Sequence, residues 1–159
     1  MAKGRVPEIN DVPAQFLYEK KQDGLSGLYR PSGNAFTRFR RVLSTVWDDF
    51  REEIESPLHS PIMGVFCYRA AECKGLLAES DGITILWNDR NYIGMEESAI
   101  SAEEEYLTFV LIHELCHAIC GVAHTPHYEA KLDDLLLQFN HLHGTDLKND
   151  YVTFNDEHD

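Results

Sequence analysis

The chain has 159 residues, of which 43% are hydrophobic and 11% aromatic, proportions that favour one globular domain over a disordered chain. Acidic residues outnumber basic residues by 27 to 14, which gives a formal net charge of −13. Because phosphate binding needs clustered Lys and Arg, this charge disfavours nucleic acids and anionic membranes as partners. We therefore expect a single domain over residues 1–159 that binds neither.

Nothing in the sequence predicts export or membrane insertion. No apolar run approaches the roughly 18 residues that a membrane span needs, and residues 1–7 lack the apolar core of a signal peptide. The cysteines show no CxxC spacing, which favours reduced thiols in a cytoplasmic protein. They are Cys67, Cys73, Cys116 and Cys120.

The first third of the chain predicts an arm followed by a long helix. Residues 1–33 are rich in Pro and Gly and read as a loosely structured arm, with one short element near Phe16. Residues 34–55 carry apolar side chains at intervals of three and four, which predicts one amphipathic helix. Its buried stripe comprises Phe36, Phe39, Leu43, Val46, Trp47, Phe50 and Ile54.

Two strands are expected next. Residues 63–68 are short and apolar, and residues 70–75 read as a connection. Residues 83–87 alternate in character, which predicts a strand with one face formed by Ile83, Ile85 and Trp87. Residues 88–100 are expected to form a loop.

A second long helix is predicted over residues 102–120. Ser101 and Glu104 have the spacing of a capping box at its start, and Gly121 follows as a left-handed stop. Together with the strands, this helix predicts an α+β fold.

A third helix begins at Pro126, with Thr125 as its N-cap, and is expected to run to about Asn140. Residues 144–159 form an acidic tail, and for residues 150–159 fraying is the favoured interpretation. The alternative is that residues 151–154 add to the sheet or lie along a cleft of the domain and restrict access to it.

The second helix contains the motif HExxH, with His113, Glu114 and His117 in place. On a helix, residues four apart share a face, so two imidazoles can hold one ion while the glutamate takes a proton from metal-bound water. A charged Glu114 in so apolar a segment would be costly to bury without a role. The motif therefore predicts a zinc site in which Glu114 is the catalytic base.

A catalytic zinc needs a third protein ligand, and both His124 and His127 are close in sequence. His127 falls on the same face of the third helix as the polar residues Lys131 and Asp134, whereas His124 lies about one turn before the apolar Tyr128. The helix register therefore favours His124 and leaves His127 as the alternative. Cys120 is read as a lining residue, because a buried cysteine near a helix end is common.

From residue 83 to residue 136 the sequence resembles the SprT/WLM/YgjP-like group of minimal zincin metallopeptidases. The resemblance is carried by the strand that ends in Asn88, the HExxH helix, and His124 followed four residues later by the aromatic Tyr128. It implies a small zincin-like domain in which a short mixed sheet packs on the long N-terminal helix and on the HExxH helix. It also implies that Zn²⁺ is bound through His113, His117 and His124. It also implies a peptide or protein substrate bound along the edge strand at residues 83–87.

The resemblance has departures and leaves alternatives. Thr125 replaces the small residue usual after the third histidine, and Gly121 comes one position too late for the metzincin spacing. A second possibility is a three-histidine metal hydrolase that acts on RNA or on a small amide. An amide-deformylating enzyme would need a cysteine ligand upstream of HExxH, and Cys73 is only a weak candidate for it. A third is a metal-binding interaction module without catalysis, against which the intact Glu114 argues.

Overall fold

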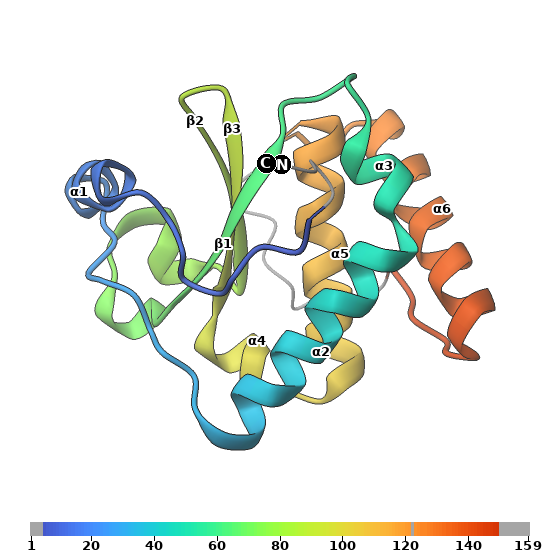
Figure 1. Ribbon diagram of the computed structural model, residues 1–159, viewed down its shortest axis with the longest axis horizontal. Helices are drawn as coiled ribbons and strands as arrows, with labels where there is room; N and C mark the ends of the chain where they lie inside the picture. Colours follow the sequence, from blue (N-terminus) through green and yellow to red (C-terminus); the bar gives the residue numbers. More distant parts are fainter. Residues whose placement is uncertain (1–4, 122, 150–159) are drawn as a thin grey trace.

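A three-stranded sheet separates the helices into two groups (Figure 1). The computed structural model describes residues 5–121 and 123–149. Its strands are β1 (Ile62–Tyr68), β2 (Gly82–Trp87) and β3 (Arg90–Glu96), in the order β1-β3-β2. Strand β3 runs parallel to β1 and antiparallel to β2, so the sheet is mixed and β2 lies at one edge. The fold is α+β, as the sequence predicts.

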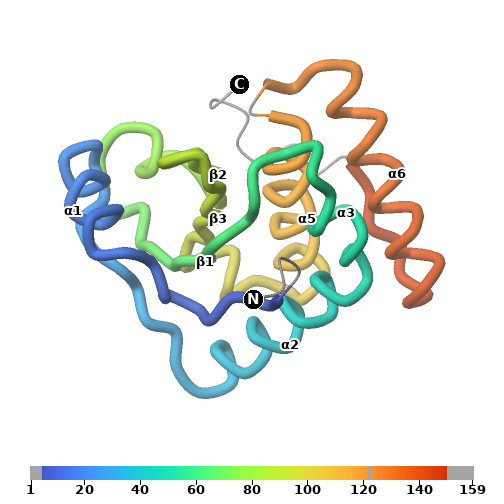
Figure 2. The backbone as a smooth tube through the Cα atoms, turned by 45° about the horizontal axis from the view of Figure 1, so that its top comes forward, coloured from blue at the N-terminus to red at the C-terminus, as the bar shows by residue number. Residues whose placement is uncertain are grey.

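Helix α1 lies on one side of the sheet, and α2, α5 and α6 lie on the other (Figures 1 and 2). Helix α5 packs between the sheet and α6. In chain order the described helices are α1 (Ala14–Gln22), α2 (Gly33–Asp49), α3 (Arg51–Glu55), α4 (Glu97–Ser101), α5 (Glu104–Cys120) and α6 (Pro126–His143). Two short 3₁₀ turns, Ala70–Glu72 and Gly75–Glu79, connect β1 to β2.

The larger hydrophobic core fills the space between the sheet and helices α2, α5 and α6. Every residue of α5 from Leu107 to Ala118 is buried, which is the pattern of a helix covered on all sides. Helix α6 buries one apolar stripe, which begins at Tyr128 and comprises Tyr128, Leu132, Leu135, Leu136 and Phe139. Helix α5 is thus the centre of the fold.

The described part of the arm, residues 5–33, is packed more closely than the sequence suggests. The short element near Phe16 is helix α1, and Phe16 is fully buried against Trp87 and Tyr92 in a second, smaller core. Asn10 fixes the arm to β1, because its side-chain oxygen accepts from the Cys67 amide at 2.8 Å. The arm therefore covers the sheet face that α5 does not.

The predicted helix over residues 34–55 is two helices. The break falls at Phe50, whose backbone (φ −112°, ψ 28°) leaves the helical region between α2 and α3. The apolar stripe nevertheless continues through the break, since Phe50 and Ile54 are both buried. Burial of the predicted stripe is correct except at Phe36, which is only half-buried, and the predicted continuity of the helix is wrong.

The expectation of a loop over residues 88–100 is wrong. Asn88 and Asp89 have φ values of 54° and 60° and form a two-residue turn, the geometry that returns a chain into an antiparallel hairpin. The chain continues as β3, the central strand, and then as α4. The strand was missed because it contains polar residues whose partners lie elsewhere in the fold. Asn91 donates to the Ser60 carbonyl at 2.9 Å, and Glu96 caps α4.

The ends of the last two long helices follow the predictions in part. The capping box is absent, because Ser101 ends α4 and α5 begins at Glu104 after Glu103. Gly121 ends α5 with φ 104°, although its ψ of 172° is not that of a left-handed cap. The N-cap Thr125 accepts from the Tyr128 amide as predicted, and α6 runs three residues beyond Asn140.

No helix in the described ranges is both long and apolar enough to span a bilayer. All four cysteines are free thiols, in line with the expectation of reduced cysteines. The tail hypothesis concerned residues 150–159, which lie outside the described residues.

Candidate metal centre

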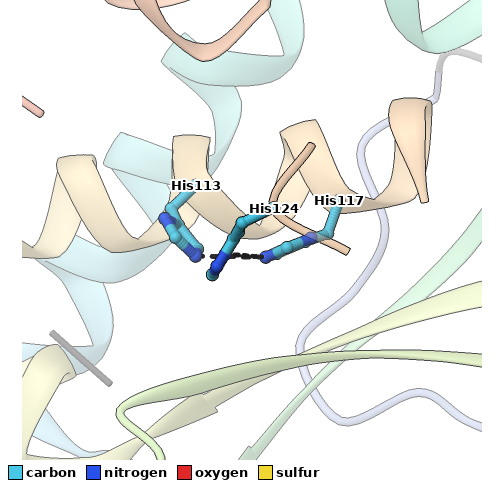
Figure 3. A group of neighbouring side chains, drawn as sticks. All are labelled: His113, His117 and His124. Carbon is cyan, nitrogen blue, oxygen red and sulfur yellow. Dashed lines mark hydrogen bonds between the residues drawn. The ribbon is translucent and has the colours of Figure 1, made fainter. Parts of the chain in front are cut away.

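Helix α5 places His113 and His117 one turn apart on the same face (Figure 3). Both are buried, with exposed fractions of 3% and 2%. Their Nε2 atoms lie 3.2 Å apart. The helical spacing of four residues, combined with burial of the whole helix, therefore brings two imidazole nitrogens to one point between α5 and the sheet.

His124 joins this pair from the segment that connects α5 to α6 (Figure 3). Its Nε2 lies 2.9 Å from Nε2 of His117. His127 is exposed on the first turn of α6 and is not part of the group. Of the two candidates that the sequence offered as a third ligand, the fold brings His124 to the pair, which is the placement that the register of α6 favoured.

The backbone fixes the tautomer of His117. Its Nδ1 lies 2.9 Å from the carbonyl oxygen of Gly121. A carbonyl only accepts, so Nδ1 must carry the hydrogen, and Nε2 of the neutral ring keeps its lone pair. This hydrogen bond is the kind that orients imidazoles in metal sites. His117 therefore presents an acceptor nitrogen toward His113 and His124.

Tyr128 packs against all three imidazoles. Its ring stacks on that of His117, with centroids 4.3 Å apart and an interplanar angle of 25°, and also contacts those of His113 and His124. Its hydroxyl donates to the His113 carbonyl at 3.1 Å. Burial raises the pKa of the Tyr128 hydroxyl well above its usual range, so the group stays neutral. The tyrosine thus ties α6 to the histidine cluster.

Glu114 is fully buried between α5 and the edge strand. The hydroxyl of Thr84 lies 2.8 Å from its Oε1, while Oε2 has no hydrogen-bond partner among the described residues. Burial raises the pKa of this carboxyl to about 8, and the hydrogen bond from Thr84 acts in the opposite direction. A buried oxygen without a partner is costly, which marks Oε2 as an acceptor kept for another group.

The cysteines nearby stay outside the cluster. Cys120 is half-buried, and burial raises the pKa of its thiol, so it remains protonated. The Cys116 thiol lies 3.6 Å from the Tyr128 carbonyl. Cys73, the weak candidate for a deformylase ligand, is buried and is not one of the grouped residues either. The candidate ligands in the described chain are therefore the three histidines.

Sequence reasoning missed the contribution of strand β2. The alternation of residues 83–87 put Ile83, Ile85 and Trp87 on one face, and the opposite face, with Gly82 and Thr84, was given no role. That face packs against α5, and Thr84 meets Glu114 there. A threonine between apolar residues on a buried strand was a signal for a polar partner. The tertiary structure was needed to identify that partner as Glu114.

Comparisons with known proteins add nothing to this geometry: no protein-family model, curated protein or solved structure matches the chain. The case for a function therefore depends on the chemistry of the site itself.

Proposed function

We propose that this chain is a zinc-dependent metallopeptidase of the minimal zincin kind, related to the SprT/WLM/YgjP-like group. His113, His117 and His124 hold the metal, and Glu114 is the general base. The observation that carries the proposal is the buried, half-satisfied carboxylate of Glu114 on the same helix as two of the three converging imidazoles. A purely structural metal site has no use for that carboxylate.

The histidine cluster fits zinc. Three imidazole nitrogens are a common set for catalytic zinc, which keeps its fourth position open. With Zn–N distances of about 2.05 Å and tetrahedral angles, the nitrogens would lie about 3.3 Å apart. Two of the three Nε2 separations, 3.2 and 2.9 Å, are close to that value, and the three ligand atoms all lie within 4.8 Å of one another. The fixed tautomer of His117 supplies the lone pair that a ligand needs.

When bound, Zn²⁺ supplies Lewis-acid chemistry, since it lowers the pKa of a water molecule and polarises a peptide carbonyl. The protein supplies the proton acceptor. Oε2 of Glu114 would take the proton from the attacking water molecule, because Oε1 already accepts a hydrogen bond from Thr84. The proton can then be passed to the leaving amine, as expected of a general acid–base residue. Burial of Glu114 excludes bulk water from this transfer.

The proposed substrate is an extended peptide or protein segment that pairs with β2. In the described chain β2 pairs with β3 alone, so its other edge is open for main-chain hydrogen bonds. Leu86 is 59% exposed and shares the α5-facing side of β2 with Thr84, which offers an apolar contact to a substrate side chain. The charge of −13 disfavours RNA as the substrate.

The four free thiols support a reducing compartment, and we place the protein in the cytoplasm on that ground.

The proposal is tested by measuring metal content and peptide cleavage on the full chain. We expect about one equivalent of zinc by elemental analysis and cleavage of members of a peptide library that stops with a zinc chelator. His113→Ala should lose the metal, because two histidines do not hold a catalytic zinc. Full zinc content without cleavage of any peptide would instead indicate an interaction module. Stoichiometric zinc in His113→Ala would remove this histidine from the site.

Tyr128 should raise the zinc affinity of the site, because it holds the three imidazole rings in place. Tyr128→Phe keeps the stacked ring and loses only the hydroxyl bond to the His113 carbonyl, so affinity should fall by less than about tenfold. Tyr128→Ala removes the stack as well, and affinity should fall by about 10–100-fold, as for other groups that orient metal ligands. Competition with a chromogenic chelator measures both values.

The exposed Tyr18 provides a matched control, since Tyr18→Ala should leave zinc affinity unchanged. Wild-type affinity in a folded Tyr128→Ala protein would show that the histidines are held without this ring.

A further inference from the structure

We infer that strand β2 is the positioning element for Glu114: the Thr84 hydroxyl holds one carboxylate oxygen, and Gly82 leaves the space that the side chain occupies. This inference rests on the proposed role of Glu114 as the base, and Thr84 and Gly82 act through that residue. It gives the edge strand a second task beside peptide pairing.

Thr84 is 8% exposed, and both hydrogen-bond acceptors of its hydroxyl belong to Glu114. They are Oε1, at 2.8 Å, and the backbone carbonyl oxygen, at 2.9 Å. A hydroxyl has one hydrogen, which these two acceptors share or exchange. Because one acceptor is main chain and the other is the carboxylate, the contact fixes the carboxylate relative to the backbone of α5. Oε2 has no hydrogen-bond partner among the described residues.

Gly82 bounds the same carboxylate from the strand. A Cβ at this position would lie 3.0 Å from Cγ and 3.1 Å from Oε2 of Glu114, and 2.9 Å from a methyl group of Val110. The backbone of Gly82 is not in the left-handed region, so any residue could adopt it. A glycine is therefore favoured here because a larger side chain would collide with its neighbours, and the Glu114 side chain occupies the space.

The sheet fixes both contacts. Thr84 pairs with Ile93 and Gly82 pairs with Met95 on the central strand, so neither position can slide along α5 independently. Reactive groups need to be held within a fraction of an ångström for efficient chemistry. Strand β2 meets that need for Glu114 in the way that Tyr128 does for the histidines.

Three isosteric or conservative substitutions test the inference. Thr84→Val removes the hydroxyl and keeps the shape; Thr84→Ser keeps the hydroxyl. Thr108→Val is the matched control, because Thr108 is also buried and its hydroxyl bonds to the Glu104 carbonyl, one helical turn away on α5. All three should keep the wild-type zinc content. Thr84→Val should lower kcat by about 10–100-fold with KM within about twofold, Thr84→Ser should restore most of kcat, and Thr108→Val should match wild type.

A stability cycle tests the contact without any activity. Thr84→Val should lower the Tm by about 2–4 °C when Glu114 is present, because it leaves a buried carboxylate oxygen without its donor. In a Glu114→Met background the shift should fall below half of that value. Equal shifts in both backgrounds, or a Thr84→Ser protein as impaired in kcat as Thr84→Val, would overturn the inference. Non-additive shifts in a protein that cleaves no peptide would keep the positioning contact and overturn the proposed function instead.

Discussion

Replacing Glu114 with Gln should lower turnover by at least about 10²–10⁴-fold, the loss typical of a missing general base. Glutamine keeps the shape of the side chain, and its amide oxygen can still accept from Thr84 at the position of Oε1. The amide nitrogen that replaces Oε2 cannot take a proton. The chemical step therefore fails while the geometry survives, and steady-state kinetics on a cleaved peptide measure the loss.

Zinc content and the far-UV spectrum are the controls for this variant, and both should equal those of wild type. The Tm should be close to that of wild type, because the amide keeps the volume of the side chain and the hydrogen bond from Thr84. Unchanged turnover with bound zinc would remove Glu114 from the mechanism. Loss of zinc would show that the carboxylate supports the metal and not the proton transfer.

The parts of the site that the sequence predicted are those that local geometry determines. His113 and His117 share a face because a helix repeats every 3.6 residues, whatever surrounds it. The preference for His124 over His127 came from the same periodicity, since the stripe that begins at Tyr128 sets which side of α6 faces the core. Helical spacing carries this information within a few residues of sequence.

The parts that could not be predicted depend on contacts between distant segments. Strand β3 carries Asn91, Gly94 and Glu96, which hide the strand in the sequence and led to the expectation of a loop, and each has a role supplied by the fold. The side-chain amide of Asn91 donates to the Ser60 carbonyl. The Glu96 carboxylate accepts from the Ala70 backbone amide and also caps α4. Gly94 leaves room for the ring of Phe66, which a Cβ would meet at 2.5 Å.

The contact that holds the Glu114 side chain could not be predicted for the same reason. Thr84 and Glu114 are 30 residues apart, and neither position by itself identifies the other. HExxH predicts a type of chemistry from the sequence alone, but the residues that contact the Glu114 carboxyl are identified only by the packing of β2 against α5.

The third-ligand assignment gives the second large expected effect. His124→Ala should weaken zinc binding by about 10²–10³-fold, since zinc sites bind with about 10–16 kcal/mol over four ligands, or about 2.5–4 kcal/mol for each. His127→Ala should leave the affinity within about twofold, because His127 is exposed and lies outside the histidine cluster. The two substitutions are chemically identical and three residues apart, so each controls the other. Chelator competition at one pH gives both affinities.

A reversed ranking would mean that the segment between α5 and α6 rearranges when the metal binds. The N-cap at Thr125 argues against this, because its side chain accepts from the Tyr128 amide and fixes the start of α6 immediately after His124. Moving His127 to the cluster would unwind that first turn and separate the Tyr128 ring from His117, with which it stacks at 4.3 Å. Equal losses in the two variants would point to exchange between the two histidines, which metal-edge X-ray absorption of each variant resolves through the number of bound imidazoles.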